Sequence, residues 1–565
     1  MTGISEFKQL FPIDSLQKVF DLFEHQFRSE NEPDLAFFSI IVGAVENNLT
    51  NIKNSDKDVN LASNKIAKVK FPCIEWEEVS VLHERFVSLM RGGVEARLLG
   101  AGAPATRELV KRVADVVWNS LTRSYYKDRA HLQSIYSFLT GNKLDCFGVA
   151  YAVTAGCQAL GKRDVHLALS EDHAWVVFGK DGAETAEVTW HGKGNEDKRG
   201  RSVGDGVSAR SWLYVAGKPV VCTREMEVGA LVSSINYTLT PTLDVHEVAL
   251  MQYRLLWMLY DKGHLDAYPM ALGNLGDLID YMQQRSNSSE EAKDHPLKDE
   301  WGSIGPTGSP RPDSAALYAQ AIRASRTHYE DRHVYPYTFQ GGYYHRNKMY
   351  KEAFHAWACA GDAIRHYNYS RDDEEIYKEF AEIANELIPQ VMKAESSGHS
   401  ARSILKDPEC FASLLRFYDG ICKWEEGSQT PILHIGWAKP LVSTISKFDA
   451  DVRAQVHIIC SPDSDQPDPQ DENGKDGDEK WNNNAELSVR DQLTAAVNSR
   501  PKVTLFSHKM AALKPLLLAG RLNTHALQLQ LTAQSQLQRP HAPAKRRDDD
   551  DAAPTARAKR ARRER

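Results

Sequence analysis

The chain has 565 residues, 42% of them hydrophobic and 26% charged, which is enough apolar material for a large folded core divided among several domains. The formal net charge of −7 gives no general argument for nucleic-acid binding. The first twenty residues lack the basic-then-apolar order of a signal peptide, and the longest apolar run, residues 36–45, is too short to cross a bilayer, so we expect a soluble intracellular protein without membrane contact.

The first predicted elements are helices. Residues 15–48 contain two of them, because apolar side chains recur there at helical spacing. Residues 106–168 continue the helical pattern. The period then changes: the segment 174–178, a turn at 179–182 and the segment 185–190 together predict a β-hairpin.

Helical periodicity returns near residue 225 and continues to about residue 393. It is interrupted by residues 286–314, which are rich in Ser, Pro, Gly and charge and predict a flexible loop, and residues 396–403 predict a shorter one. Residues 461–480 contain no apolar side chain and eight of the twenty are acidic, so we expect disorder there. Residues 502–536 then predict a helical segment with several leucines available to dock on the rest of the chain.

The eight cysteines are scattered along the chain, and none forms a C-x-x-C pair. This spacing argues against a zinc site, and still more strongly against a disulfide framework. We therefore expect free thiols, buried in every case except Cys146, and no metal or other cofactor.

A helical-repeat pattern lies in the second half of the chain. Glycine, aromatic and alanine residues fall where a tetratricopeptide repeat requires them, at Gly341, Tyr344, Tyr350, Ala353, Trp357 and Ala360. Residues 255–275, with Gly263 at a turn, form a second, degenerate unit. Stacked helix pairs of this kind leave a concave face that suits an extended peptide, although the motif positions themselves are packing positions.

An acidic helix is predicted at residues 372–382. Glu375, Glu379 and Glu382 share one face of this helix because they are separated by four and three residues. Like charges at this spacing repel, so the face either contacts a cationic partner or is an ordinary solvated face with Lys378 as a neighbour.

Three residue types with catalytic potential occur in order as Cys146, His173 and Glu187. A cysteine that opens a helix gains thiolate character, and a histidine and an acid on neighbouring strands would complete a nucleophilic constellation. The pattern resembles the transglutaminase-like core, but Glu187 replaces the usual Asp and Leu144 an expected Gly. We interpret the three residues as vestiges of lost chemistry and expect no enzyme activity; an active cysteine transferase or hydrolase is the alternative.

The C-terminal residues are strongly basic in two clusters about eleven residues apart, as in a bipartite nuclear import signal. The clusters consist of Lys545, Arg546, Arg547, Lys559, Arg560, Arg562 and Arg563. Weak nonspecific binding of DNA or RNA is the other interpretation of this tail, but the run of aspartates from Asp548 to Asp551 argues against tight wrapping of DNA.

Several long stretches resemble the menin family. They are residues 164–178, 189–197, 268–275, 374–380 and 410–427. The likeness runs from about residue 10 to residue 459, fails through the acidic segment and resumes from residue 503 to residue 536. The resemblance thus covers nearly the whole chain and is more specific than any single motif.

The resemblance implies a mainly α fold with a small β portion, arranged like a cupped hand. The expected parts are an N-terminal helical domain (1–94), a transglutaminase-like α+β thumb (95–222), a repeat-built palm (223–398), helical fingers (399–460), an acidic linker (461–500), a C-terminal helical segment docking on the fingers (501–537) and a basic tail (538–565). It also implies a monomeric nuclear scaffold that regulates transcription and has no catalytic activity.

In this family the pocket between thumb and palm captures a Phe-Pro-x-Arg-Pro type peptide, found at the N-terminus of mixed-lineage-leukaemia (MLL) type histone methyltransferases and in JunD. A chromatin-tethering protein of the lens-epithelium-derived growth factor type is a further expected partner. Carried over by matching motif, the peptide-binding residues are Asp128, Ser170, His173, Ala174, Ser233, Tyr268, Met270, Asn274, Tyr335, Thr338, Phe339, Trp357, Glu375, Glu379 and Glu382.

The sequence departs from the vertebrate pattern of the family at the expected pocket floor. Thr338 and Phe339 replace Met and Tyr, Ser233 replaces Cys, and Ala230 replaces Phe; Cys146 stands where the pattern has Ser. We therefore expect a pocket of altered shape.

Overall fold

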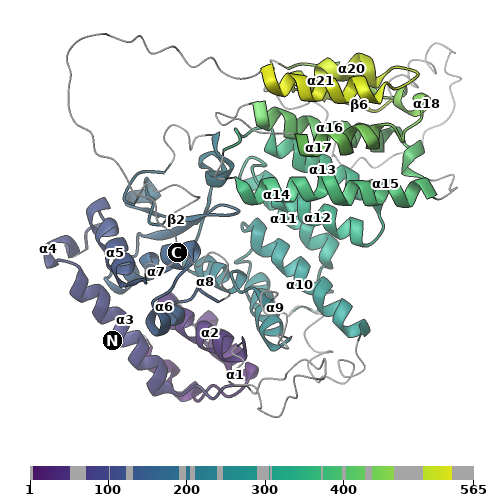
Figure 1. Cartoon of the computed structure of the whole chain (residues 1–565). Helices are drawn as coiled ribbons and strands as arrows, with labels where there is room; N and C mark the ends of the chain where they lie inside the picture. The colour runs from purple at the N-terminus through teal and green to yellow at the C-terminus, as the bar shows by residue number, and fades with distance from the viewer. Residues whose placement is uncertain are drawn as a thin grey trace, which may run out of the picture.

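The computed structural model describes residues 4–50, 71–100, 102–122, 131–189, 199–203, 210–237, 246–288, 305, 308–370, 373–397, 403–426, 435–462 and 500–537. Within these ranges the chain is mainly helical with two small sheets, which confirms the predicted fold class (Figure 1). Most of the expected loop at 286–314, the acidic linker and the whole basic tail lie outside the described residues. In the part that is described, no helix is long and apolar enough to cross a membrane.

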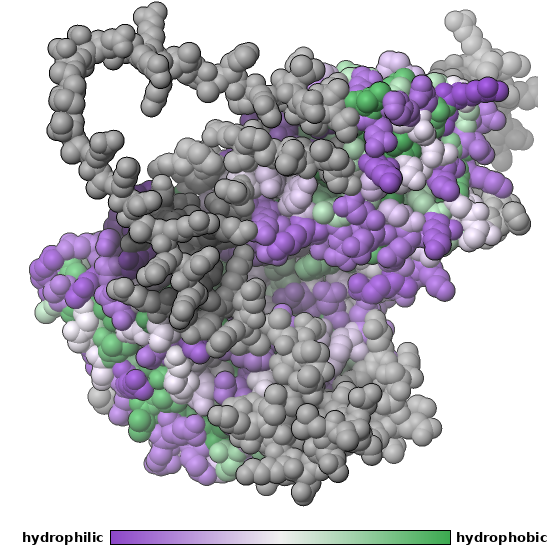
Figure 2. Space-filling model, viewed as in Figure 1, coloured by the Kyte–Doolittle hydropathy of each residue, from purple (hydrophilic) through white to green (hydrophobic). Residues whose placement is uncertain are grey.

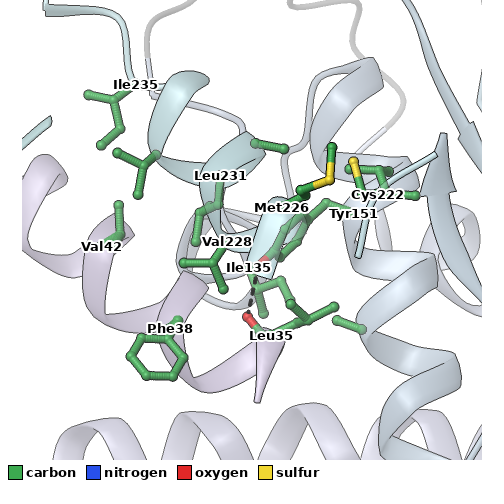
Figure 3. Close-up of a cluster of buried hydrophobic side chains, with 14 of the residues drawn as sticks. Leu35, Phe38, Val42, Ile135, Tyr151, Cys222, Met226, Val228, Leu231 and Ile235 are labelled. Atoms are coloured by element: carbon green, nitrogen blue, oxygen red, sulfur yellow. Dashed lines mark hydrogen bonds between the residues drawn. The ribbon is translucent and has the colours of Figure 1, made fainter. Parts of the chain in front are cut away.

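The N-terminal helices form as predicted, as α1 (Leu16–Arg28) and α2 (Leu35–Thr50), and α3 (Trp76–Gly93) follows. Helix α2 is buried around nearly its whole circumference because it is almost entirely apolar. Figure 3 shows its side chains packed against the helix α8 (Arg224–Ser233), and the Tyr151 hydroxyl donates to the Leu35 carbonyl at 3.3 Å. One continuous core therefore joins the N-terminal helices to the thumb and to the start of the palm.

Residues 95–222, which the sequence predicts as the thumb, combine helices with a four-stranded antiparallel sheet. The helices are α4 (Ala96–Leu99), α5 (Arg107–Ser120), α6 (Ile135–Gly141) and α7 (Cys146–Ala159). The strands lie in the order β3 (Glu184–Ala186), β2 (Ala174–Phe178), β1 (His166–Leu169), β4 (Val220–Val221). The predicted hairpin is confirmed by the pairing of β2 with β3. The helical prediction for residues 166–168 is wrong: a short apolar run fits a buried strand as well as a helix.

The palm continues with α9 (His246–Asp261), α10 (Pro269–Ser288), α11 (Ser314–His328), α12 (Tyr335–Arg346) and α13 (Tyr350–Ile364). The repeat pattern corresponds to the neighbouring helices α12 and α13. A Cβ atom at Gly341 would lie 2.4 Å from Trp357 Nε1, so only glycine allows this close packing. Gly263 lies between α9 and α10 with a φ of 76°, as a turn between two helices requires.

The palm ends in an extended helical element. It begins with α14 (Glu374–Glu382), continues through a π-helical turn at Ile383–Leu387 and ends with α15 (Ile388–Ser397). Helices α14 and α15 lie next to the fingers, and Figure 2 shows hydrophilic side chains gathered over this part of the molecule.

The fingers contain α16 (Pro408–Glu426), α17 (Ile435–Ile445) and α18 (Ala450–Arg453). Strand β5 (His457–Cys460) pairs in parallel with β6 (Lys502–Leu505), and α20 (His508–Leu517) and α21 (Thr524–Leu537) pack on α16 and α17. The helical prediction for residues 502–505 is therefore wrong, because a pairing partner far back in the chain makes this segment a strand. Asp419 of α16 accepts N–H groups from Phe506 at 2.8 Å and Ser507 at 3.0 Å, which fixes the start of α20.

All eight cysteines lie in the described ranges and are free. The expectation that all but Cys146 are buried is wrong for three of them: Cys73 and Cys460 are exposed, and Cys359 is partly exposed. Cys460 is the last residue of β5 and lies on the same face of the strand as buried Ile458, so its exposure follows from its place at the strand end.

Candidate functional site

A cavity of about 250 Å³ lies where the thumb meets the palm. The start of α7, the turn between β1 and β2, the end of α8 and the start of α10 all contribute to its wall. The lining residues are Cys146, Phe147, Leu169, Ser170, Glu171, Asp172, His173, Ala174, Ala230, Ser233, Ser234, Tyr268, Met270 and Asn274. The fold thus brings together seven predicted peptide-binding residues that are separated by up to 104 positions in sequence: Ser170, His173, Ala174, Ser233, Tyr268, Met270 and Asn274.

A tight turn between β1 and β2 forms the thumb side of the cavity. The Ser170 hydroxyl accepts the N–H groups of Asp172 at 3.3 Å and His173 at 3.0 Å, and the Ser170 N–H donates to the His173 carbonyl at 2.9 Å. Such a serine-capped turn holds its backbone without help from solvent. This wall is therefore rigid before any ligand arrives.

The same turn ties the thumb to the palm through Glu171. Its carboxylate accepts the N–H of Val334 at 2.8 Å, the N–H of Tyr335 at 2.7 Å and the indole N–H of Trp212 at 2.7 Å. Val334 is the N-cap of α12 and offers no capping side chain, so Glu171 supplies the cap from the other domain. Burial raises the pKa of Glu171 to about 7, against the hydrogen bonds from Val334, Trp212 and Tyr335, which lower it.

Nothing in the local sequence marks Glu171 as a capping residue, because its backbone partners are 163 and 164 residues away. One indirect signal exists: α12 starts without Ser, Thr, Asp or Asn at its N-cap. A helix start that lacks its own cap needs an acceptor from elsewhere in the fold.

Aromatic side chains line the palm next to the cavity. Tyr335 and Phe339 stack with ring centroids 5.4 Å apart, and Trp212 meets Tyr335 edge to face at 5.7 Å. A Cβ atom at Gly273 would lie 3.1 Å from the Phe339 ring, so the small residue on α10 lets this ring pack closely. The amide of Gln252 donates to the carbonyls of Val232 at 3.0 Å and Ile235 at 2.8 Å, which fixes the end of α8 that carries Ser233.

Carboxylates from two parts of the chain converge on Tyr335. Burial raises the pKa of this phenol, and the charges of Asp172, Glu171, Glu379 and Glu375 raise it further. The turn of the thumb and the helix α14 therefore face the same ring. We call these four side chains, together with Glu382 from the predicted acidic face of α14, the acidic lip: Glu171, Asp172, Glu375, Glu379 and Glu382.

Glu379 is the best-enclosed member of the predicted acidic face. Burial raises its pKa, the charge of Glu382 adds to this, and a hydrogen bond with the side chain of Thr338 lowers it; the net shift is upward. Thr338 is itself only 3% exposed. Glu375 Oε1 lies 3.1 Å from Lys378 Nζ, and Glu382 is exposed to solvent. The three glutamates therefore share one face of the helix but differ in burial and in ion pairing.

Seven of the predicted residues are not among those that line the cavity: Tyr335, Thr338, Phe339, Trp357, Glu375, Glu379 and Glu382. Trp357 is 1% exposed and packs in the core between α12 and α13, so the expectation that it forms part of the pocket wall is wrong for this cavity. Its place in the repeat motif explains this outcome, because motif positions are packing positions. Asp128 lies outside the described residues.

Two of the three transglutaminase-like residues, His173 and Glu187, are in direct contact. His173 Nε2 lies 2.8 Å from Glu187 Oε2, which also accepts the Tyr214 hydroxyl at 3.0 Å. Burial raises the pKa of Glu187, but the charge of His173 and hydrogen bonds from His173, Thr189 and Tyr214 outweigh burial and hold that pKa below its ordinary value. A buried, hydrogen-bonded histidine–carboxylate pair therefore lies at the cavity wall, with His173 among the lining residues.

Cys146 opens helix α7, as predicted, but its surroundings oppose the expected thiolate character. Burial raises the pKa of the Cys146 thiol, and the charges of Asp145 and Asp172 raise it further. Asp145 is the N-cap of α7 and accepts the Gly148 N–H at 2.6 Å, so a carboxylate stands where the helix start would otherwise favour a thiolate. Among the described residues, no group of three or more His, Cys, Asp or Glu side chains is placed to hold a metal ion.

Comparison with known proteins places this geometry in context. The sequence model of the family described as Menin matches residues 4–295, 301–492 and 467–561. Among solved structures, the chain is similar to a crystal structure of menin that reveals the binding site for Mixed Lineage Leukemia (MLL) protein. The two are 43% identical in sequence, with a TM-score of 0.70, and the match covers 92% of this chain and 99% of that one.

Proposed function

The chain belongs to the menin family, and from this premise we propose that it is a nuclear scaffold that captures a short Phe-Pro-x-Arg-Pro type peptide in the thumb–palm cavity. The peptide would come from an MLL-type histone methyltransferase or from a JunD-like transcription factor. By holding such a partner, the scaffold would regulate transcription without catalysing a reaction. The observation that carries the proposal is the juxtaposition of an apolar cavity with the acidic lip.

The floor of the cavity suits an aromatic anchor. Met270, Ala174 and Ala230 contribute apolar surface and Phe147 adds an aromatic ring. A peptide Phe that buries about 150–200 Å² of apolar surface here would contribute on the order of 4–5 kcal/mol before the entropy losses of binding. Because Ala230 is small, we expect a floor wide enough to accept a large side chain.

The acidic lip suits the arginine of the same peptide. Three peptide bonds separate Phe from Arg in the motif, which is about 10 Å in an extended chain. Carboxylates at the lip would hold the guanidinium through charge-assisted hydrogen bonds, for which Arg is better suited than Lys. Glu379 is partly desolvated, and this strengthens such a pair relative to one at an open surface.

Isothermal titration calorimetry with the full chain tests the proposal. We expect a twelve-residue peptide containing Phe-Pro-x-Arg-Pro to bind with a Kd in the micromolar range or tighter. Replacing the peptide Phe by Ala should weaken binding by about a hundredfold, since the anchor is lost, and replacing Arg by Ala by about tenfold. No heat of binding, or equal affinity for the Phe-to-Ala peptide, would refute the proposal.

The basic tail would provide nuclear import. We propose that the two clusters at residues 545–547 and 559–563 act as a bipartite import signal, with weak binding to DNA as a secondary property. A fluorescent fusion that lacks residues 545–565 should remain cytoplasmic; unchanged nuclear signal would leave the tail without this role. A tethering partner of the lens-epithelium-derived growth factor type would join the assembly on chromatin.

The alternative function is a transglutaminase-like cysteine transferase or hydrolase that uses Cys146, His173 and Glu187. The close contact of His173 with Glu187 favours it, because this pair would orient the histidine as a general base. The raised pKa of the Cys146 thiol argues against it, since the nucleophile must be a thiolate. We therefore propose the scaffold function and keep the enzyme as the alternative.

A further inference from the structure

A second hollow lies further along the same helical element, between α15 and α17. These helices lie side by side where the palm meets the fingers (Figure 1). The hollow has a volume of about 580 Å³, within the range of about 300–1,000 Å³ that is usual for ligand sites. Met392, Pro389 and Pro440 supply its apolar surface. We call this hollow the α15–α17 groove.

Three lysines surround the α15–α17 groove: Lys393 on α15, Lys439 on α17 and Lys447 just after α17. All three are exposed, and none forms an ion pair with any residue that the structure describes. Two acidic residues lie two positions from a groove lysine in sequence. Glu395, near Lys393, accepts from the Ser403 hydroxyl at 2.8 Å and the Ile404 N–H at 3.1 Å, and Asp449, near Lys447, forms no ion pair with it. The groove therefore carries three positive charges that no described carboxylate balances.

Some lysines in the same half of the molecule are balanced by carboxylates. Lys351 pairs with Asp407 at 3.1 Å and also with Glu409, and Lys378 pairs with Glu375 at 3.1 Å. Others, such as Lys348 and Lys502, form no ion pair with a described residue, so the groove is distinguished by the grouping of three unpaired lysines around one hollow. Grouped charges of one sign raise the local concentration of a ligand of opposite charge.

The hydroxyl groups of the groove narrow the chemistry of the ligand. Ser396 donates to the Met392 carbonyl at 2.6 Å, Ser397 to the Ala394 carbonyl at 2.8 Å and Thr444 to the Pro440 carbonyl at 2.8 Å. These three hydroxyls donate to carbonyls of their own helices, and the fourth hydroxyl of the groove, that of Ser443, is exposed. Recognition of an anion would therefore depend mainly on the lysine ammonium groups, which act as mobile point charges rather than as a fixed fork. Such a site selects a ligand by the number and spacing of its charges and not by the shape of one small molecule.

We propose that the α15–α17 groove docks an extended acidic segment of a partner protein. Lys439 and Lys447 are eight residues apart, which corresponds to about 12 Å at the helical rise of 1.5 Å per residue. An extended peptide covers this distance in about four residues. The groove thus fits a segment with acidic side chains repeated about every fourth position and small apolar residues between them, which contact Met392 and the two prolines. This surface is separate from the thumb–palm cavity and would recruit a different partner.

Fluorescence anisotropy with the full chain tests the inference. The probe is a fluorescein-labelled twelve-residue peptide with glutamate at every fourth position and alanine or proline between, and its control carries glutamine in place of glutamate. We expect the acidic probe to bind with a Kd of tens of micromolar at low salt, and the neutral control not to bind. Because exposed ion pairs are individually weak, affinity should fall at least tenfold between 50 and 300 mM salt.

The variant Lys393→Glu/Lys439→Glu/Lys447→Glu should weaken binding of the probe at least tenfold. The matched control Lys180→Glu/Lys348→Glu/Lys502→Glu makes the same change in net charge at exposed lysines outside the groove and should change the Kd less than twofold. Melting temperatures within a few degrees of the parent show that both variants fold. If charge reversal unfolds the chain, Lys393→Gln/Lys439→Gln/Lys447→Gln replaces the first variant, with a fivefold loss expected.

Several outcomes would overturn the inference. Equal weakening in both triple variants would mean general electrostatic attraction, and absence of binding would mean no site at all. A twelve-nucleotide single strand of thymidine that binds through the same three lysines more tightly than the peptide would make the groove a nucleic-acid site. Binding of the probe only after removal of residues 463–499 would assign the groove to the chain's own acidic segment rather than to a partner.

Discussion

The two proposed ligand sites, the thumb–palm cavity and the α15–α17 groove, are built in opposite ways. Backbone hydrogen bonds fix the walls of the cavity, as at Ser170 and Glu171, and its floor is apolar. Exposed, unpaired lysines surround the groove, and three of its four hydroxyls donate to carbonyls of their own helices. Because of this difference, we expect ligand selectivity to come from shape and desolvation in the cavity, and from the total charge of the ligand in the groove. A single substitution should therefore change ligand affinity in the cavity, whereas several substitutions together should be needed to change it in the groove.

The largest expected effect comes from Met270→Lys. Met270 lines the cavity, and a charged ammonium placed against its apolar floor would have to be desolvated whenever a peptide Phe enters. We expect the Kd of the Phe-Pro-x-Arg-Pro peptide to rise at least a hundredfold in calorimetry. Met270→Leu, which conserves volume and polarity, should stay within threefold of the parent. An unchanged Kd in Met270→Lys would show that the peptide does not bind in the cavity. The comparison between cavity and groove would then no longer hold.

The rigidity of the cavity wall can be tested through Glu171. Its folded pKa of about 7 lies above the ordinary value, so the stability linked to its protonation is present below about pH 4.5 and is lost as the pH rises through 7. Glu171→Gln removes this titration and keeps a carbonyl acceptor for the N–H groups of α12. The parent should thus lose on the order of 1–3 kcal/mol more stability than the variant between pH 5 and pH 7.5.

Chemical denaturation of parent and variant at the two pH values measures this difference. Burial also raises the pKa values of Asp145 and Asp419 to about 6, so the parent carries further losses of the same sign. Those losses are common to parent and variant and cancel in the comparison. Parallel stability curves for the two chains would show that Glu171 does not titrate in this range, and the tie between thumb and palm would need another explanation.

The acidic lip should give a smaller effect on peptide binding. Glu375→Lys/Glu379→Lys removes two carboxylates that face Tyr335 and adds two positive charges beside the peptide arginine. We expect the Kd to rise about tenfold, or about 1.4 kcal/mol, and its dependence on salt to become flatter. Glu386→Lys, on the exposed π-helical turn, is the matched control and should leave both quantities nearly unchanged. A double variant with the salt slope of the parent would show that the lip does not contact the peptide.

The sequence predicts the two regions to different extents, for physical reasons. Ser170, His173 and Met270 could be assigned to the cavity because long stretches around them resemble a known family. Glu171 could not, because its cap on α12 depends on backbone groups about 160 residues away. Residues 502–505 were predicted helical for a similar reason, since β6 exists only through its pairing with β5. The α15–α17 groove is likewise formed by helices about 50 residues apart in sequence, so no local sequence pattern predicts it.

The smallest expected effect concerns Cys146, the cavity residue that links the scaffold to its enzymatic alternative. Cys146→Ala should change the Kd of the peptide less than twofold, because Met270 and the aromatic surface supply the anchor. In the parent at pH 8, iodoacetamide should modify exposed Cys73 and Cys460 at least ten times faster than Cys146, since burial and the nearby Asp145 and Asp172 raise the pKa of the Cys146 thiol. Mass spectrometry of tryptic peptides measures these rates. Saturating peptide should slow Cys146 further, because that residue lines the occupied cavity, and leave Cys73 unaffected. A Cys146 rate that reaches its plateau below pH 8.5 would instead mean a thiolate ready for catalysis, and the cavity would then have to be considered an active site.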